Sequence, residues 1–261
     1  MATSEGYWND PPPEGVPASM GLFALPDHYV ATRTELQRVA THVLARRRTD
    51  LCGKFGLRAT PGGIGMPASG AEHEVVRIAG TTLVREVTGS EARTTMLELR
   101  GATLADAAVL VGVDLATAFQ AGSDTPPVGD PAAQLVVDPS AAAALADWFA
   151  YGWTVIDTAV GSLPAEAEPS VLQLWPEHFD AGSDVAAAPG RRANLGASPG
   201  DGATPDPYLY VGPWDDARPG DASYWNAPFG AVLGYDEMLA AADPVALGVA
   251  FLCRGIDLLA S

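Results

Sequence analysis

Hydrophobic side chains recur every three to four residues in three stretches of the chain, which is the period of a helix with one buried face. Residues 27–48 form the first stretch. Residues 138–161 and the stretch from residue 243 onward each begin with an Asp-Pro pair, which favours a helix start. The pattern predicts an N-terminal helix, a long central helix and a C-terminal helix. Their apolar positions are Leu36, Val39, Val43, Leu44, Leu145, Trp148, Phe149, Val155, Ile156, Ala159, Leu247, Phe251, Leu252 and Ile256.

Short runs with strand character fall into two groups between these helices. Gly-rich turns separate the first group and predict an antiparallel meander of three or four strands. Because the strands do not alternate with helices, we expect an α+β fold rather than a doubly wound parallel sheet. In that fold, antiparallel sheets pack with the long central helix and the N- and C-terminal helices. The runs are GKFGLRAT, EVVRIAG, TTLVREV and TTMLELR, then VLQLW, RANLGA, YLYVGPW and FGAVLG.

Two local motifs predict conformations. Thr103 and Asp106 have the spacing of an acidic capping box, which predicts a short helix that Gly112 ends. The tetrapeptide AGSD occurs at residues 121–124 and 181–184, and its Gly, Ser and Asp favour a turn at both places. No aligned internal repeat accompanies it.

Charge narrows the expected partners. The 261 residues include 32 Asp plus Glu against 15 Lys plus Arg, a formal net charge of −17. Such a surface repels nucleic acids and anionic membranes, so we expect neither as a partner, and we expect a monomer or weak dimer. No run reaches the roughly 18 apolar residues of a membrane span, and Cys52 and Cys253 are too few for a disulfide framework. These features predict a cytoplasmic protein.

The first 20 residues differ in composition from the rest. They are rich in Pro, Gly and acidic residues and lack the positive start and apolar stretch of a signal peptide. The whole chain is 48% hydrophobic, which is ample for one sizeable core. We therefore expect a flexible acidic tail over residues 1–20 and a single α+β domain over residues 21–261.

The segment LQLWPEHFD, residues 172–180, places polar groups directly after an apolar run. Pro176 removes a ladder donor, so His178 and Asp180 should emerge at a sheet end. In an extended segment both side chains lie on one side and could begin a divalent-metal site. The structural alternative is that His178 hydrogen-bonds buried carbonyls and Asp180 caps the AGSD turn. A second histidine ligand would be His28, His42 or His73.

Aromatic residues are concentrated between positions 175 and 229, among polar side chains. Such a mixture makes good walls for a small-molecule pocket, and it also makes good core for a loop-rich region. The candidate metal ligands are His178 and Asp180. The candidate ligand-binding residues are Trp175, His178, Asp180, Asn194, Tyr208, Tyr210 and Trp225.

The sequence GASPG at residues 196–200 matches the Gly-x-Ser-x-Gly pattern of a hydrolase nucleophile elbow. In that elbow the residue after the serine donates its backbone N–H to the oxyanion hole, but Pro199 has no N–H. All four histidines also precede Ser198, against the usual chain order of that fold. We interpret the motif as a Ser-Pro-Gly turn.

Several segments together resemble a family of uncharacterised proteins from high-GC actinobacteria. More distantly, their layout is similar to a broader bacterial domain family of unknown function. The resemblance covers about residues 25–260 and implies a single domain in a bacterial cytosol, but no reaction, cofactor or catalytic residue. The segments are GKFGLRATPGGIGMP, VLQLWPEHFDAG, ANLGASPGDGATPDPYLYVGPW and YWNAPFGAVLGY.

Two classes of function remain open. The leading hypothesis is small-molecule binding, with or without catalysis, at a pocket lined by the aromatic and acidic loops of residues 171–230. The alternative is a non-catalytic structural or protein-interaction domain whose aromatic loops only pack or mediate assembly.

Overall fold

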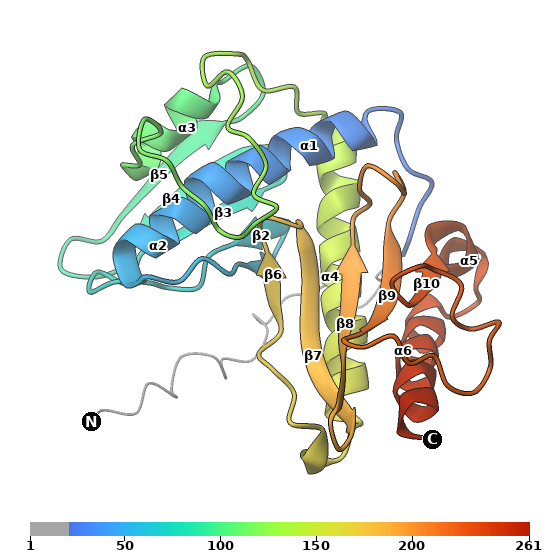
Figure 1. Cartoon of the computed structure of the whole chain (residues 1–261). Coiled ribbons are helices and arrows are strands. Elements are labelled where there is room, and N and C mark those ends of the chain that lie inside the picture. Colours follow the sequence, from blue (N-terminus) through green and yellow to red (C-terminus); the bar gives the residue numbers. More distant parts are fainter. Residues whose placement is uncertain (1–20) are drawn as a thin grey trace, which may run out of the picture.

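The chain folds into two antiparallel sheets that share one long central helix (Figure 1). The computed structural model describes residues 21–261, so the tail expected over residues 1–20 lies outside the described residues. Each sheet has five strands in sequential order. The expected α+β class, with a long central helix and N- and C-terminal helices, is confirmed.

The first half begins with one continuous helical segment that contains a π-helical part in its middle. α1 (Tyr29–Val39) continues through a π-helical segment, η1 (Ala40–Ala45), into α2 (Arg46–Cys52). His42 lies in this π-helical segment and is 3% exposed. Its ring Nε2 lies 2.8 Å from the carbonyl oxygen of Pro126.

The first sheet is a meander that follows the chain from β1 to β5. The sequence predicted three or four strands because residues 63–65, which begin at the last glycine of PGG, were not recognised as a strand. They form β2, which pairs with β1 in a hairpin. The strands are β1 (Arg58–Thr60), β2 (Gly63–Gly65), β3 (Val75–Ala79), β4 (Thr82–Val87) and β5 (Arg93–Glu98).

Two helices between the sheets begin as their sequences predict. α3 (Leu104–Val111) carries the capping box: the Asp106 N–H donates to Thr103 Oγ1 at 3.0 Å, and the Thr103 N–H donates to Asp106 Oδ2 at 2.9 Å. α4 (Pro139–Gly161) begins at Asp138, whose carboxylate accepts two backbone N–H groups. No helix in the described residues is long and apolar enough to cross a membrane.

The second sheet is also a sequential meander, and two helices follow it. Its first strand is preceded by one short 3₁₀ turn. The elements are η2 (Ala165–Ala167), β6 (Gln173–Trp175), β7 (Asp180–Ala188), β8 (Arg191–Ser198), β9 (Tyr208–Pro213), β10 (Ala231–Gly234), α5 (Tyr235–Ala240) and α6 (Pro244–Ala260).

The turn predicted at residues 181–184 is wrong. This copy of AGSD lies inside β7, whereas the copy at residues 121–124 does form a turn. Tertiary contacts override the local preference, because Ser183 donates its hydroxyl to the carbonyl oxygen of Ser170 at 2.8 Å instead of capping its own backbone.

One backbone pair joins the two sheets. Leu57 and Leu174 exchange N–H···O bonds of 2.7 and 2.8 Å, so the edge strands β1 and β6 meet there. On each side of this pair, a long helix leads into a five-stranded meander. The two halves therefore share one layout, although their sequences show no aligned repeat.

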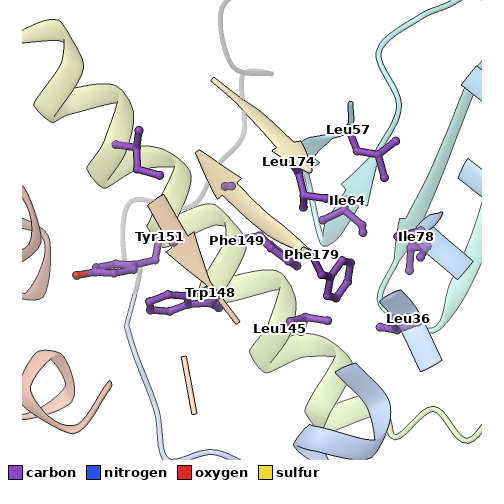
Figure 2. Close-up of a cluster of buried hydrophobic side chains, with 14 of the residues drawn as sticks. Leu36, Leu57, Ile64, Ile78, Leu145, Trp148, Phe149, Tyr151, Leu174 and Phe179 are labelled. Carbon is purple, nitrogen blue, oxygen red and sulfur yellow. The ribbon is translucent and has the colours of Figure 1, made fainter. Parts of the chain in front are cut away.

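The helix α4 runs through the hydrophobic core (Figure 2). Trp148 and Tyr151 lie on one side of it, and Phe149 meets Phe179 edge-on on the other, with ring centroids 5.2 Å apart. Trp148 and Phe149 are each 1% exposed. The predicted packing of this helix against the second sheet, with both aromatic residues buried, is confirmed.

Candidate functional site

The second sheet has one face covered by helices and one without them. A β-carbon on Gly152 of α4 would lie 2.4 Å from Ala197 Cβ, and one on Gly255 of α6 would lie 2.9 Å from both methyl groups of Val211. Because Ala197 and Val211 point to the same side of the sheet, both helices pack on that side. The opposite side, here called the outer face, has no helix against it in the described part of the chain.

Five of the seven predicted ligand-binding residues share this outer face. Trp175 pairs with Asp180 across β6 and β7. Tyr208 and Tyr210 are two positions apart on β9, so both point to the outer face. Asn194 lies on the same side of β8. The sheet therefore places on one face five residues that are up to 35 positions apart in the sequence.

Tyr210 reaches Asp180 across the strand that separates them. Its phenol donates a hydrogen bond of 2.5 Å to Asp180 Oδ2. The ring lies directly on Gly196 of β8, where a β-carbon would come within 2.2 Å of Tyr210 Cζ. Gly182 of β7 lies beneath the hydroxyl: a β-carbon built on Gly182 would lie 3.7 Å from the Tyr210 hydroxyl oxygen. Glycines on two neighbouring strands thus form the floor on which the phenol rests.

Asp180 is an acid held away from water. It is 7% exposed, and its Oδ1 has no hydrogen-bond partner among the described residues. Burial raises the pKa of Asp180 above its ordinary value, against the opposing effect of the Tyr210 hydrogen bond. Burial and the charge of Asp180 also raise the pKa of Tyr210. Burial therefore disfavours the charged forms of both groups, the carboxylate and the phenolate.

A buried arginine fastens the loop after β8. The Arg33 guanidinium donates to the carbonyl oxygens of Pro199, Asp201 and Pro205 at 3.3, 3.3 and 2.7 Å. Tyr208 donates to Asp201 Oδ2 at 2.6 Å, so the same loop folds over the tyrosine row. Sequence reasoning missed Arg33 because its partners lie at least 166 residues away.

The turn between β6 and β7 is strained. Phe179 has a φ of +58° although it is a bulky residue and 1% exposed. Left-handed backbone at such a residue costs on the order of 1–3 kcal/mol and persists only where the surroundings enforce it. Here Gln37 donates to the carbonyl oxygen of Glu177 at 3.1 Å, and Thr41 donates to that of Pro176 at 2.9 Å.

This turn separates His178 from Asp180. The side chain of His178 is 54% exposed, with Nε2 3.9 Å from Asp124 Oδ2. The extended geometry expected for His178 and Asp180 is wrong, because Phe179 bends the backbone between them. The structural alternative is also wrong in detail, since His178 is not buried and Asp180 begins β7. Glu177, which was expected to emerge at the sheet end but was not among the candidate ligands, is 8% exposed with Oε2 lacking a partner among the described residues.

A metal centre does not assemble around this turn in the described residues. No group of three or more His, Cys, Asp or Glu side chains lies close enough together there to hold an ion. A divalent metal at His178 and Asp180 stays a prediction.

Trp225 lies away from the outer face. Its Nε1 donates to the carbonyl oxygen of Pro219 at 2.9 Å, and its ring meets Tyr224 edge-on at 4.9 Å. Tyr224 in turn packs on Phe251 of α6. We therefore assign Trp225 to the packing of the loop before β10 rather than to the shared site.

Ser198 takes part in a turn. The Gly200 N–H donates to Ser198 Oγ at 3.2 Å, and a loop rather than a helix follows β8. This geometry agrees with the Ser-Pro-Gly turn expected from the sequence. Ser198 pairs with Tyr208 in the sheet register, so its hydroxyl belongs to the same polar row as Asp180.

An apolar cavity lies elsewhere in the fold. It measures about 10 Å³, between α1, β2, β3 and α4, which is about the space of one water molecule. Its lining includes Leu36, Ile64 and Phe149 and no charged side chain. This cavity is too small for a metabolite.

Comparison with protein-family models, curated proteins and solved structures finds no match for this chain. The resemblance to an actinobacterial family, drawn from sequence segments, therefore stays a prediction. What the protein does has to be argued from the outer face itself.

Proposed function

We propose that the outer face of the second sheet binds a small polar ligand, with Asp180 as the anchoring group. The observation that supports this most is the unpartnered Oδ1 of Asp180, an oxygen buried without a hydrogen bond. Buried polar atoms in native proteins nearly always have partners, and an exception calls for a missing donor. A ligand that donates a hydrogen bond supplies it.

The chemistry of the surroundings narrows the class of ligand. A carboxyl oxygen accepts hydrogen bonds, so the ligand carries a hydroxyl, amide or amine group. The net charge of −17 disfavours an anionic ligand. Tyr210 is half-buried and forms the outer wall, packed edge-on against Phe229 at 6.1 Å. A ligand approaches Asp180 by moving this phenol from its glycine floor.

Catalysis is a natural extension of this proposal. A buried carboxyl with a raised pKa beside a phenol is a pairing that proton-transfer enzymes use. As an acid, Asp180 would protonate the ligand and leave a carboxylate that the Tyr210 hydrogen bond stabilises; as a base, its Oδ1 would take up the proton of the ligand group that donates to it. A loss of turnover in Tyr210→Phe that exceeds its loss of ligand binding distinguishes this extension from binding alone.

The test is native mass spectrometry of the purified protein before and after denaturation. The expected result is a released small molecule in the wild type that is absent from Asp180→Asn and reduced in Tyr210→Phe. Asp216→Asn, an exposed acid in a loop, is the matched control and should release as much as the wild type. Equal release from Asp180→Asn would remove Asp180 from the site. Elemental analysis of the same samples tests the predicted metal.

The competing function is a non-catalytic interaction domain. Two large side chains of the outer face favour it, because Trp214 is 62% and Phe229 is 48% exposed. Sedimentation velocity measures the oligomeric state and so tests whether the outer face mediates self-assembly. A dimer that Phe229→Ser dissociates supports the interaction domain, whereas a monomer over the whole concentration range agrees with the expected monomer or weak dimer.

A further inference from the structure

The outer face carries an exposed and immobilised indole at the end of the sheet far from Asp180. Trp214 is 62% exposed, yet its Nε1–H donates to Asn194 Oδ1 at 2.9 Å. The guanidinium carbon of Arg192 lies 5.6 Å from the centroid of the ring. Large aromatic side chains are normally buried on folding, so an indole fixed in solvent suggests a role in binding.

Arg192 covers only one face of the ring and is itself held in place. Its Nε donates to Asp184 Oδ1 at 2.6 Å, and its Nη2 donates to the carbonyl oxygen of Glu168 at 3.0 Å. Because Arg192 is fixed against one side and most of Trp214 is exposed, the other face of the indole is open to solvent. Such a platform is ordered before any ligand arrives, which reduces the entropy lost on binding.

The row next to Trp214 supplies polar groups and open space. Asp184 pairs with Asn194, and Asn194 pairs with Gly212, so these three residues cross the sheet side by side. Gly212 carries no side chain, and a β-carbon built there would lie 3.9 to 4.0 Å from Tyr210 and Phe229, so the sheet surface is low at this position next to Asn194. The Asn194 amide nitrogen and the Asp184 Oδ2 have no protein hydrogen bond in the described part of the chain, so one donor and one acceptor remain.

We propose that Trp214, Asn194, Asp184 and Gly212 form a binding site for a neutral saccharide. A sugar ring has an apolar face of C–H groups that packs on an aromatic ring. Its edge carries neighbouring hydroxyls that both donate and accept hydrogen bonds. One hydroxyl accepts from Asn194 and the next donates to Asp184, while the missing side chain at Gly212 leaves the neighbouring position of the sheet free for the sugar. Asp184 and the net charge of −17 disfavour acidic sugars. This site does not depend on Asp180.

Saturation-transfer difference NMR on the whole protein tests the proposal, with cellohexaose, maltohexaose and chitohexaose as probes. At least one probe should receive saturation at its ring C–H protons. Its affinity should fall by at least about tenfold in Trp214→Ala and in Asn194→Ala, and less in Trp214→Phe, which keeps an aromatic face. Met96→Ala removes a side chain of similar exposure, 64%, from the other sheet and should leave the signal unchanged.

Two results would overturn the proposal. One is that none of the three probes gives a signal that depends on Trp214, in samples whose circular dichroism is unchanged. The other is that Trp214→Ala dissociates an oligomer in sedimentation velocity, which would make the indole an interface between copies of this chain. Stronger binding of glucuronic-acid oligomers than of the neutral probes would also contradict the assigned charge preference.

Discussion

The phenol of Tyr210 lies flat on Gly196 and donates a 2.5 Å hydrogen bond to Asp180, one strand further on. This contact joins β9 to β7 across β8 through side chains rather than through the backbone ladder. It requires a residue without a side chain at position 196, because any β-carbon would occupy the place of the ring. The glycine, the phenol and the acid therefore act as one structural unit.

The first prediction concerns Gly196→Ala. The added β-carbon would lie 2.2 Å from Tyr210 Cζ, so the ring has to leave the sheet and the hydrogen bond to Asp180 breaks. We expect a loss of about 2–4 kcal/mol in the free energy of unfolding, measured by urea denaturation. Gly212→Ala is the control on the same face, where the nearest atom is 3.9 Å away, and it should change stability little. Equal effects of the two changes would contradict the packing described.

The second prediction is a pH dependence that Asp180 causes. Burial raises the pKa of Asp180 in the folded state, so the native protein retains this proton to higher pH than the unfolded chain does. The stabilisation is complete below the unfolded value of about 3.9 and declines as pH rises towards the folded pKa. Stability relative to Asp180→Asn should therefore fall with rising pH in urea titrations. A difference that is constant with pH would show that the pKa is not raised.

Tyr210→Phe extends this test. The hydrogen bond from Tyr210 lowers the pKa of Asp180, against the larger effect of burial. Removing the hydroxyl should raise the folded-state pKa of Asp180 further, so the decline in stability should continue to higher pH than in the wild type. An unchanged pH profile would mean that the phenol does not contact the carboxylate in solution.

Local sequence signals predicted those elements whose ends are fixed by neighbours in the chain. Asp138 and Thr103 cap helices through backbone groups within three residues, so their patterns could be read directly. β7 was missed because Gly182 and Ser183 have turn preferences. The pairing of β7 with β6 and β8 and the hydrogen bond from Ser183 to Ser170 override those preferences, and they come from other parts of the chain.

The candidate site could be predicted only in part, because only some of its residues carry a signal in their local sequence. Aromatic and polar composition indicated Tyr208, Tyr210 and Asp180, and alternation along the strands brings them to one face. Arg33 was missed because its role depends on a helix crossing the loop after β8. His178 was misplaced because the positive φ of Phe179 cannot be inferred from a residue type that normally avoids it.

A third prediction concerns the buried acid of the first sheet. Glu74 accepts hydrogen bonds of 2.8 Å from Arg47 and from Arg85, and its side chain is 4% exposed. Glu74→Gln leaves both guanidinium groups without their counter-charge, and we expect a loss of about 2–4 kcal/mol in urea denaturation. Glu86→Gln breaks the half-exposed pair with Arg77 and should change stability by about 0–1 kcal/mol.

The pH dependence of this second acid has the opposite sign to that of Asp180. Burial alone would raise the pKa of Glu74, but the hydrogen bonds from Arg47 and Arg85 outweigh it and lower the pKa. The stabilisation is therefore present above the unfolded value of about 4.3 and is lost as pH falls through the folded pKa. The difference between the wild type and Glu74→Gln should shrink in acid. A difference that grows in acid would contradict the ion pairs.

The last prediction compares two tryptophans in opposite environments. Trp148 is 1% exposed and packs against Tyr151 and Tyr235, with ring centroids at 5.4 and 5.9 Å. Trp148→Ala leaves a cavity in the core and should reduce the free energy of unfolding by about 3–5 kcal/mol. Trp214→Ala removes the same side chain from the surface, where it is 62% exposed, and should reduce it by less than about 1 kcal/mol.

A third variant separates packing from hydrogen bonding at Trp148. Its Nε1 has no hydrogen-bond partner among the described residues, so Trp148→Phe loses volume but no hydrogen bond. Its effect in urea denaturation should therefore be well below that of Trp148→Ala, because the phenyl ring fills most of the space. If phenylalanine destabilises as much as alanine, the Nε1 must have a partner, such as a buried water, and the indole contributes more than its packing.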